Sequence, residues 1–157
     1  MDIAFYAESP NCDERPVGMA IDTVVLHATV LDTLNEVIEK FADPASQVSA
    51  HYTIDRDGTI VMHVLEVKRA WHAGQSRMKD GRERVNDFSI GIELVNRNDG
   101  LDPYPAEQIH SLRELLKGIF VRHPIRYIVT HQECADPPGR KSDPVGFDPA
   151  WIRGLPA

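Results

Sequence analysis

Residues 21–28 read IDTVVLHA, and residues 24–26 at the centre of this stretch form an uninterrupted apolar run. A run of this kind predicts a strand that is buried on both faces of a sheet. Directly after it, apolar residues recur at helical spacing from Leu31 to Phe41, and Pro44 ends the predicted helix. A buried strand followed by an amphipathic helix indicates a fold that combines sheet and helix.

The rest of the chain extends this pattern. Four further strands are predicted, at residues 51–55, 59–64, 88–95 and 126–130. The dipeptide Asp57-Gly58 between the first two is a strong hairpin signal. A second helix begins near Pro105, and its apolar stripe runs from Ile109 to Phe120. We therefore expect one domain over residues 1–157 of the α/β type (mixed α+β), with a central mixed sheet flanked by helices.

The composition excludes several classes of protein. The chain has 157 residues, 42% of them hydrophobic, and a formal net charge of −7 at pH 7. An acidic chain is a poor match for a nucleic-acid binder with a general basic surface, or for a protein that adheres to anionic lipid. No apolar run approaches the roughly 20 residues that a membrane span requires. We therefore expect neither nucleic acid nor a membrane among its partners.

Basic residues gather in one segment of this acidic chain. Residues 68–84 contain six bases against two acids. The segment is either a solvated loop or a local wall that binds anions. The sequence alone leaves both interpretations open.

Two of the seven histidines stand at the ends of predicted strands. His27 closes the buried strand at residues 21–28, and His131 directly follows the strand at residues 126–130. Neutral imidazoles held on rigid strands are suitable ligands for Zn²⁺, and a catalytic zinc site takes about three protein ligands. Cys134 and Asp143 both lie downstream of His131 and either could supply the third ligand. Spacing does not choose between them.

Glu93 is unusual because it lies within the apolar strand at residues 88–95. Carboxylates are seldom buried without a partner. One interpretation is a glutamate that faces solvent from an edge strand. The other is a general base beside a metal site.

A set of motifs in one order supports the second interpretation. The motifs are Val25-Leu26-His27, Ser49-Ala50-His51-Tyr52, Arg56-Asp57-Gly58, Ala70-Trp71-His72-Ala73-Gly74, Gly81-Arg82-Glu83-Arg84, Asn86-Asp87-Phe88-Ser89-Ile90-Gly91-Ile92-Glu93-Leu94, Thr130-His131 and Gly139-Arg140-Lys141-Ser142-Asp143-Pro144. From about residue 21 to residue 148, the chain resembles the type 2 N-acetylmuramoyl-L-alanine amidases. That family includes cell-wall-recycling amidases, envelope-anchored amidases, phage lysins and peptidoglycan recognition proteins.

The resemblance implies a zinc hydrolase with one Zn²⁺ per chain. The family's ligand positions fall on His27, His131 and Asp143, which favours Asp143 over Cys134 as the third ligand. Glu93 falls on the general-base position, and Lys141 falls on a position that stabilises the developing oxyanion.

The resemblance also implies substrate-binding residues. Trp71 and His72 match a motif that lines the substrate cleft. Arg84 matches a position that contacts acidic groups of the peptide stem in the recycling branch. His51 and Asn86, which lie within the shared motifs, are expected to join them.

The sequence departs from the family pattern in two places. Residues 132–138 form a longer link than usual between His131 and the loop that carries Lys141 and Asp143, so that loop could sit differently. The link at residues 41–49 is short, as in the envelope branch, whereas residues 81–94 resemble the recycling branch. The branch is therefore open at this point.

The expected reaction is hydrolysis of the amide between the lactyl group of N-acetylmuramic or anhydro-N-acetylmuramic acid and L-alanine of the stem peptide. The substrate would be peptidoglycan or a soluble muropeptide, and the enzyme a monomer that serves cell wall degradation or recycling. The alternative is a peptidoglycan-binding module without catalysis. Two cysteines and no recognisable signal peptide favour the cytoplasm, with release by lysis as a phage-type lysin as the alternative.

Overall fold

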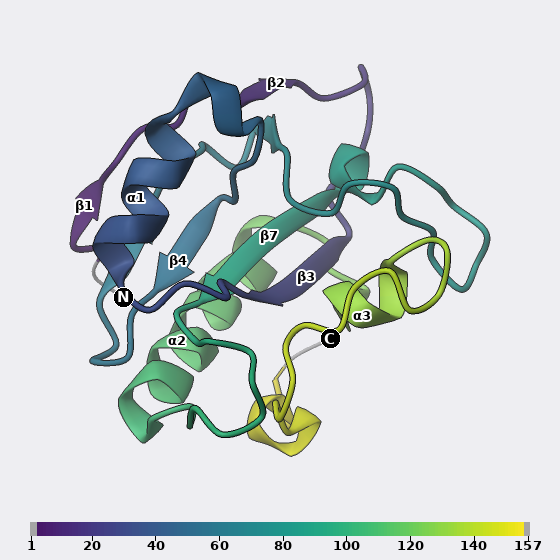
Figure 1. The fold of residues 1–157 in the computed structure, drawn as a ribbon. Coiled ribbons are helices and arrows are strands. Elements are labelled where there is room, and N and C mark those ends of the chain that lie inside the picture. The colour runs from purple at the N-terminus through teal and green to yellow at the C-terminus, as the bar shows by residue number, and fades with distance from the viewer. Residues whose placement is uncertain (1–2, 156–157) are drawn as a thin grey trace.

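The computed structural model of the chain describes residues 3–155 (Figure 1). Its main sheet has six strands in the order β1-β5-β4-β7-β3-β8, and β2 and β6 form a separate ribbon. The strands are β1 (Phe5–Tyr6), β2 (Cys12–Glu14), β3 (Thr23–Ala28), β4 (Tyr52–Ile54), β5 (Ile60–Met62), β6 (Lys68–Ala70), β7 (Ser89–Leu94) and β8 (Tyr127–Thr130). The helices are α1 (Leu34–Ala42), α2 (Ala106–Arg122) and α3 (His131–Cys134), with 3-10 turns at Pro44–Ser46, Val85–Phe88 and Pro149–Ile152.

The main sheet is mixed, as predicted. β3 runs parallel to β7 on one side and to β8 on the other, and β4 is parallel to β7. β4 and β5 form the predicted antiparallel hairpin. Gly58 in its turn has φ +89°, a left-handed conformation that glycine adopts without a steric penalty.

Strand alternation gives the sheet two different faces. Every residue of β3 is buried, which confirms the prediction for this strand. Val24 and Leu26 point to the face covered by α2, where they pack with Leu112 and Leu116. Figure 1 shows α1 on the opposite side of the central strands. His27 points to that second face because it alternates with Leu26 along the strand.

The second face is covered in two parts. Val37 and Phe41 of α1 form one small apolar cluster with Val95. Val25 lies in another cluster with Phe88 and Cys134. Between the two clusters, the polar residues at the carboxyl ends of β3 and β7 are left to form a site.

Helix boundaries follow the capping chemistry. α1 begins at Leu34 because Thr33 forms a capping box with Glu36, so Leu31 lies before the helix. Thr130 forms a second capping box with Glu133, which starts the single turn α3 immediately after β8. The sequence did not predict α3 or the short strands β1, β2 and β6, because two to four residues carry too little periodicity. No helix among the described residues is both long and apolar enough to cross a bilayer.

Candidate active site

Two strand ends and one loop bring three ligand-type side chains together on the second face of the sheet. Leu26 of β3 pairs with Thr130 of β8, so His27 and His131 emerge side by side. The two Nδ1 atoms are 3.1 Å apart. Asp143 lies 3.1 Å from Nδ1 of His131 through Oδ1, and 3.5 Å from Nδ1 of His27 through Oδ2. All three residues are buried, and their donor atoms lie within 4.8 Å of one another.

The outer hydrogen bonds orient these donor atoms inward. Nε2 of His131 donates to the carbonyl oxygen of Ala73 at 3.1 Å, so in the neutral ring Nδ1 carries a lone pair. Nε2 of His27 lies 3.0 Å from Nδ1 of His72, and Nε2 of His72 lies 3.1 Å from Oγ of Ser89. If Nε2 of His27 donates to His72 and Nε2 of His72 donates to Ser89, the Nδ1 atom of His27 also carries a lone pair. Two lone pairs and a carboxylate that face one another are a donor set that fits a divalent cation such as Zn²⁺.

The protonation states agree with this arrangement. Burial lowers the pKa of His27 to about 4, so its ring is neutral near pH 7. Burial alone would raise the pKa of Asp143, but the close contact of its carboxylate with the rings of His131 and His27 outweighs this effect and holds the pKa below its usual range. The site thus offers the neutral imidazole of His27 and the anionic carboxylate of Asp143, the ligand states that Zn²⁺ requires.

Glu93 stands beside this cluster. It pairs in register with His27 across β3 and β7, and it lines the same pocket. Its Oε2 atom is buried and has no hydrogen-bond partner among residues 3–155. Burial, followed by repulsion from Asp143, raises the pKa of Glu93 to about 8. A carboxyl oxygen without a partner, beside a metal-type ligand set, suits a proton acceptor and not a structural role.

A pocket of about 340 Å³ opens above these residues. Lys141 lines it from the loop that carries Asp143, and Trp71 and His72 line it as expected from the sequence. The buried ring of His72 is hydrogen-bonded to His27, so this residue orients the His27 ring as well as forming part of the pocket wall. Lys40 of α1 also lines the pocket, and the sequence reasoning missed it because a lysine in the last turn of a helix is explained by the helix dipole.

Arg84 and Asn86 lie in an adjoining pocket instead. This second pocket, of about 310 Å³, shares Trp71 with the first. The Oδ1 atom of Asn86 accepts a hydrogen bond from the Ala73 backbone at 2.8 Å, so its carboxamide fixes the loop that carries the cleft residues. The side chain of Arg84 is largely exposed.

The structure places His51, which was expected to bind substrate, outside the pocket. Its side chain is fully buried and does not line the pocket. Nδ1 accepts a hydrogen bond from the Gly91 backbone at 3.0 Å, and Nε2 donates to the carbonyl oxygen of Lys68 at 3.0 Å. Burial, followed by repulsion from Arg15, lowers its pKa to about 3. Both ring nitrogens serve the fold, which leaves His51 none for a substrate.

Cys134 is also placed away from the donor atoms. Its thiol is buried in the apolar cluster with Val25 and Phe88, and burial raises its pKa to about 12. Despite the longer link at residues 132–138, Asp143 reaches the histidines. Its carbonyl oxygen accepts a hydrogen bond from the Gln132 backbone at 3.0 Å, directly beside His131.

The basic segment at residues 68–84 is not a free cationic wall. Most of its charges are paired with acids of the chain: Lys68 with Glu14, Arg69 with Asp13 and Asp87, Arg77 with Glu83, Arg82 with Asp22 and Asp80, and Arg84 with Asp87. Some of these acids lie within or next to the segment, and others, Asp13, Glu14 and Asp22, come from the start of the chain. The structure thus supports neither a general anion-binding wall nor a merely solvated loop.

A substitution at Gly91 tests whether the contact between His72 and His27 supports the metal site. A Cβ atom added at this position would lie 2.5 Å from the ring of His72. We expect Gly91→Ala to destabilise the fold by about 1–3 kcal/mol through overpacking, and to weaken zinc binding about 10- to 100-fold as His72 moves away from His27. Urea unfolding of the metal-free protein and a chelator competition measure the two effects.

A second substitution separates the two causes. Adding His72→Ala to Gly91→Ala removes the clash, so His72→Ala should cost less stability in the Gly91→Ala background than in the unaltered protein, while zinc affinity stays low. Full zinc affinity in Gly91→Ala would contradict the proposed dependence of His27 on His72.

A buried set of two imidazoles and one carboxylate, with an unpartnered glutamate beside it on a mixed sheet, is the arrangement of a metal-dependent hydrolase. The sequence pattern of the N-acetylmuramoyl-L-alanine amidase family (Amidase_2) matches residues 17–146. The chain therefore belongs to this family of type 2 amidases, which confirms the resemblance seen in its motifs.

Individual relatives agree with this assignment. The chain is 36% identical to the 1,6-anhydro-N-acetylmuramyl-L-alanine amidase AmpD of Haemophilus influenzae over 157 residues, which covers 87% of this chain and 83% of the relative. A crystal structure of an AmpD selenomethionine derivative superposes with a TM-score of 0.87 at 36% identity, over 99% of this chain and 95% of the other.

A solved complex is also similar. It contains Escherichia coli AmiD with the substrate anhydro-N-acetylmuramic acid-L-Ala-D-gamma-Glu-L-Lys, and it superposes with a TM-score of 0.70 at 34% identity. The match covers 83% of this chain and 56% of AmiD, so this chain spans just over half of that protein.

Proposed function

We propose that residues 1–157 form one zinc-dependent catalytic domain that hydrolyses the amide between the lactyl group of anhydro-N-acetylmuramic acid, or of N-acetylmuramic acid, and L-alanine of the stem peptide. The observation that carries this proposal is the convergence of His27, His131 and Asp143 beside the unpartnered Glu93 in one pocket.

His27, His131 and Asp143 would hold the zinc ion. When bound, Zn²⁺ supplies Lewis acidity that polarises the scissile carbonyl and activates water. The hydrogen bonds of His27 to His72 and of His131 to Ala73 keep the two imidazole rings oriented for this ligand set.

Glu93 acts as the general base in this proposal. Its carboxylate accepts a proton from the attacking water while the oxygen of that water bonds to the carbonyl carbon. The same proton passes to the amide nitrogen as the C–N bond breaks, which releases the free amine of L-alanine. Lys141 lines the pocket, and in this proposal its ammonium group stabilises the oxyanion that develops on the carbonyl oxygen.

The relatives indicate the sugar form of the substrate. The AmpD relative is named for the 1,6-anhydro form, and the AmiD complex contains an anhydro substrate. Both are similar to this chain over most of its length, so we propose soluble anhydro-muropeptides as the preferred substrate and cell wall recycling as the role. Cys12 and Cys134 are both free thiols, which agrees with a reducing cytoplasm as the location of the enzyme. Cell fractionation tests this location.

A peptidoglycan-binding module without catalysis receives no specific support. The proposed ligands, Glu93 and Lys141 all line one pocket, whereas a module that only binds its ligand has no need of the complete set.

Soluble anhydro-muropeptides and intact sacculi, incubated with the protein in parallel, test the proposal directly. Mass spectrometry should detect free stem peptide and anhydro-N-acetylmuramic acid, with faster release from the soluble substrate. A strong chelator should abolish the reaction and added Zn²⁺ should restore it. Cleavage by metal-free protein would refute the zinc mechanism, and binding without cleavage would favour the binding module.

A further inference from the structure

Two side chains outside the pocket hold the loop that carries Lys141 and Asp143. Tyr104 donates through its hydroxyl to the carbonyl oxygen of Val145 at 3.0 Å, and Asn98 makes two further contacts. Oδ1 of Asn98 accepts a hydrogen bond from the Val145 backbone at 2.6 Å. Nδ2 of Asn98 donates to Oγ of Ser142 at 3.2 Å. These two contacts bracket Asp143, since one partner precedes it and the other follows it by two residues.

Asn98 is itself held in a fixed position. Its φ of 60° lies in the left-handed region, which asparagine tolerates better than most residues. Its backbone N–H donates to Oδ1 of Asn96 at 2.7 Å. Asn96 is fully buried, and its Nδ2 donates to the carbonyl oxygens of Asp102 and Pro103. The carboxamide of Asn98 therefore projects from a locally closed loop.

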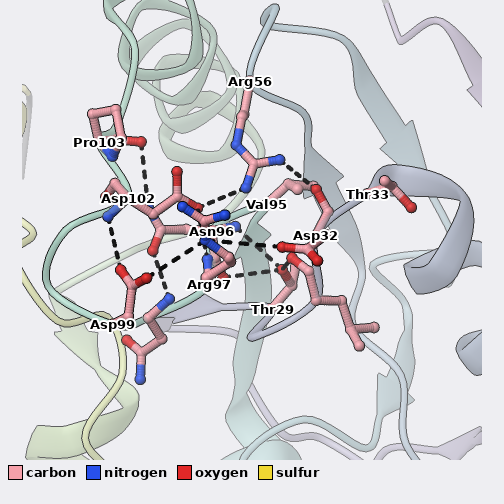
Figure 2. Close-up of polar contacts among 12 residues, drawn as sticks. Thr29, Asp32, Thr33, Arg56, Val95, Asn96, Arg97, Asp99, Asp102 and Pro103 are labelled. Carbon is pink, nitrogen blue, oxygen red and sulfur yellow. Dashed lines mark hydrogen bonds and ion pairs between the residues drawn. The ribbon is translucent and has the colours of Figure 1, made fainter.

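Figure 2 shows the polar network that closes this loop. The carboxylate of Asp102 accepts from Arg56 at 2.6 Å and from the Arg97 backbone at 2.8 Å. Oδ1 of Asp99 accepts from the backbones of Leu101 and Asp102. The network thus joins the segment that follows β4 to the segment that follows β7.

The same network reaches the segment after β3. The Asn96 backbone donates to Oγ1 of Thr29 at 3.2 Å, and the carbonyl oxygen of Asn96 accepts from Val30 at 2.9 Å. Residues 28–31 line the pocket, and the Ala28 backbone donates to Oδ2 of Asp143 at 3.3 Å. Asp143 is therefore fixed from both sides by segments that the network holds together.

We propose that Asn98 is a positioning residue of the metal site, whose carboxamide clamps the loop at residues 142–145 and thereby sets the affinity of the site for Zn²⁺. The inference rests on the proposed zinc function. Asn98 touches neither the donor atoms nor the substrate pocket, so it acts only through the placement of Asp143 and Lys141.

Three substitutions of Asn98 isolate its side chain. Asn98→Gly keeps the left-handed backbone and removes both hydrogen bonds, and Asn98→Ser serves in the same comparison if the glycine variant does not fold. Asn98→Asp retains an acceptor for the Val145 N–H, and its second carboxylate oxygen can accept from the Ser142 hydroxyl in place of the donated hydrogen bond, so both contacts are kept. Gln47→Gly is the matched control, because Gln47 is exposed, has φ 52° and lies in another loop.

Zinc affinity, measured by competition with a chromogenic chelator, is the primary readout. We expect a 10- to 100-fold weaker affinity in Asn98→Gly, as is usual when the outer support of a ligand is lost. Asn98→Asp and Gln47→Gly should bind zinc as tightly as the unaltered protein. Amide exchange of Val145 in the metal-free protein should be faster in Asn98→Gly alone.

Each other outcome has a definite meaning. Equal zinc affinity in Asn98→Gly and the unaltered protein would overturn the inference and leave the proposed function intact. An equal loss in Gln47→Gly would overturn it too, because backbone freedom alone would then account for the effect. No zinc binding by the unaltered protein would contradict the proposed function itself.

Discussion

Asp143→Ala is expected to empty the metal site and abolish hydrolysis, whereas Cys134→Ser is expected to leave both nearly unchanged. Asp143 supplies the only carboxylate within 3.5 Å of both His27 and His131 among the described residues. Two imidazoles alone hold zinc weakly, since catalytic sites take about three protein ligands. The loss of zinc affinity should exceed the roughly 100-fold loss that follows removal of a residue that only orients a ligand.

Zinc stoichiometry after dialysis and turnover of an anhydro-muropeptide measure this result on three variants made in parallel. The third variant is Asp143→Cys, which tests whether another anionic ligand can replace the carboxylate. A thiolate also ligates zinc and carries the same charge as the carboxylate. That variant should keep the metal at least in part. If Cys134→Ser emptied the site while Asp143→Ala kept its zinc, the ligand set would have to be redrawn around the thiol.

The positions of the site residues that lie on strands could be predicted from the sequence. The apolar run at residues 24–26 fixes a buried strand, and the alternation of side chains along it determines which way His27 points. Glu93 follows from the same rule on β7, because parallel neighbours in register bring their side chains to one face. For these residues local pattern and global fold agree.

Contacts between residues far apart in the chain could not be predicted in this way. Six basic residues within residues 68–84 look like a cationic wall, but their partners include Asp13, Glu14 and Asp22 from the start of the chain. His51 lies within a shared motif, yet the backbones of Gly91 and Lys68 occupy both of its nitrogens. No periodicity or spacing encodes such partners.

Loops limited the prediction for a related reason. The left-handed backbone of Asn98 and its grip on residues 142–145 depend on a loop closed by side-chain hydrogen bonds. An asparagine in a polar loop has many local partners available to it. Only the folded chain shows which partner it takes.

Glu93→Gln is expected to lower kcat by about 10²- to 10⁴-fold, the usual cost of losing a positioned general base. Glutamine keeps the shape of the side chain and removes its ability to accept a proton. Zinc content should not change, because Glu93 is not among the residues whose donor atoms converge. Turnover of an anhydro-muropeptide, zinc stoichiometry and urea unfolding are to be measured on the same preparation.

The unfolding measurement separates a catalytic role from a structural one. Oε2 of Glu93 is buried and has no hydrogen-bond partner in the part of the chain that the structure describes. Burial raises the pKa of Glu93 to about 8, so the metal-free fold favours the neutral carboxyl group at neutral pH. A neutral amide removes the cost of burying a charge there, so metal-free Glu93→Gln should be at least as stable as the unaltered protein. A large loss of turnover with unchanged zinc content and undiminished stability is the signature of a base. Near-normal kcat in Glu93→Gln would place the proton acceptor elsewhere in the pocket, and a matching loss of stability would make the glutamate structural.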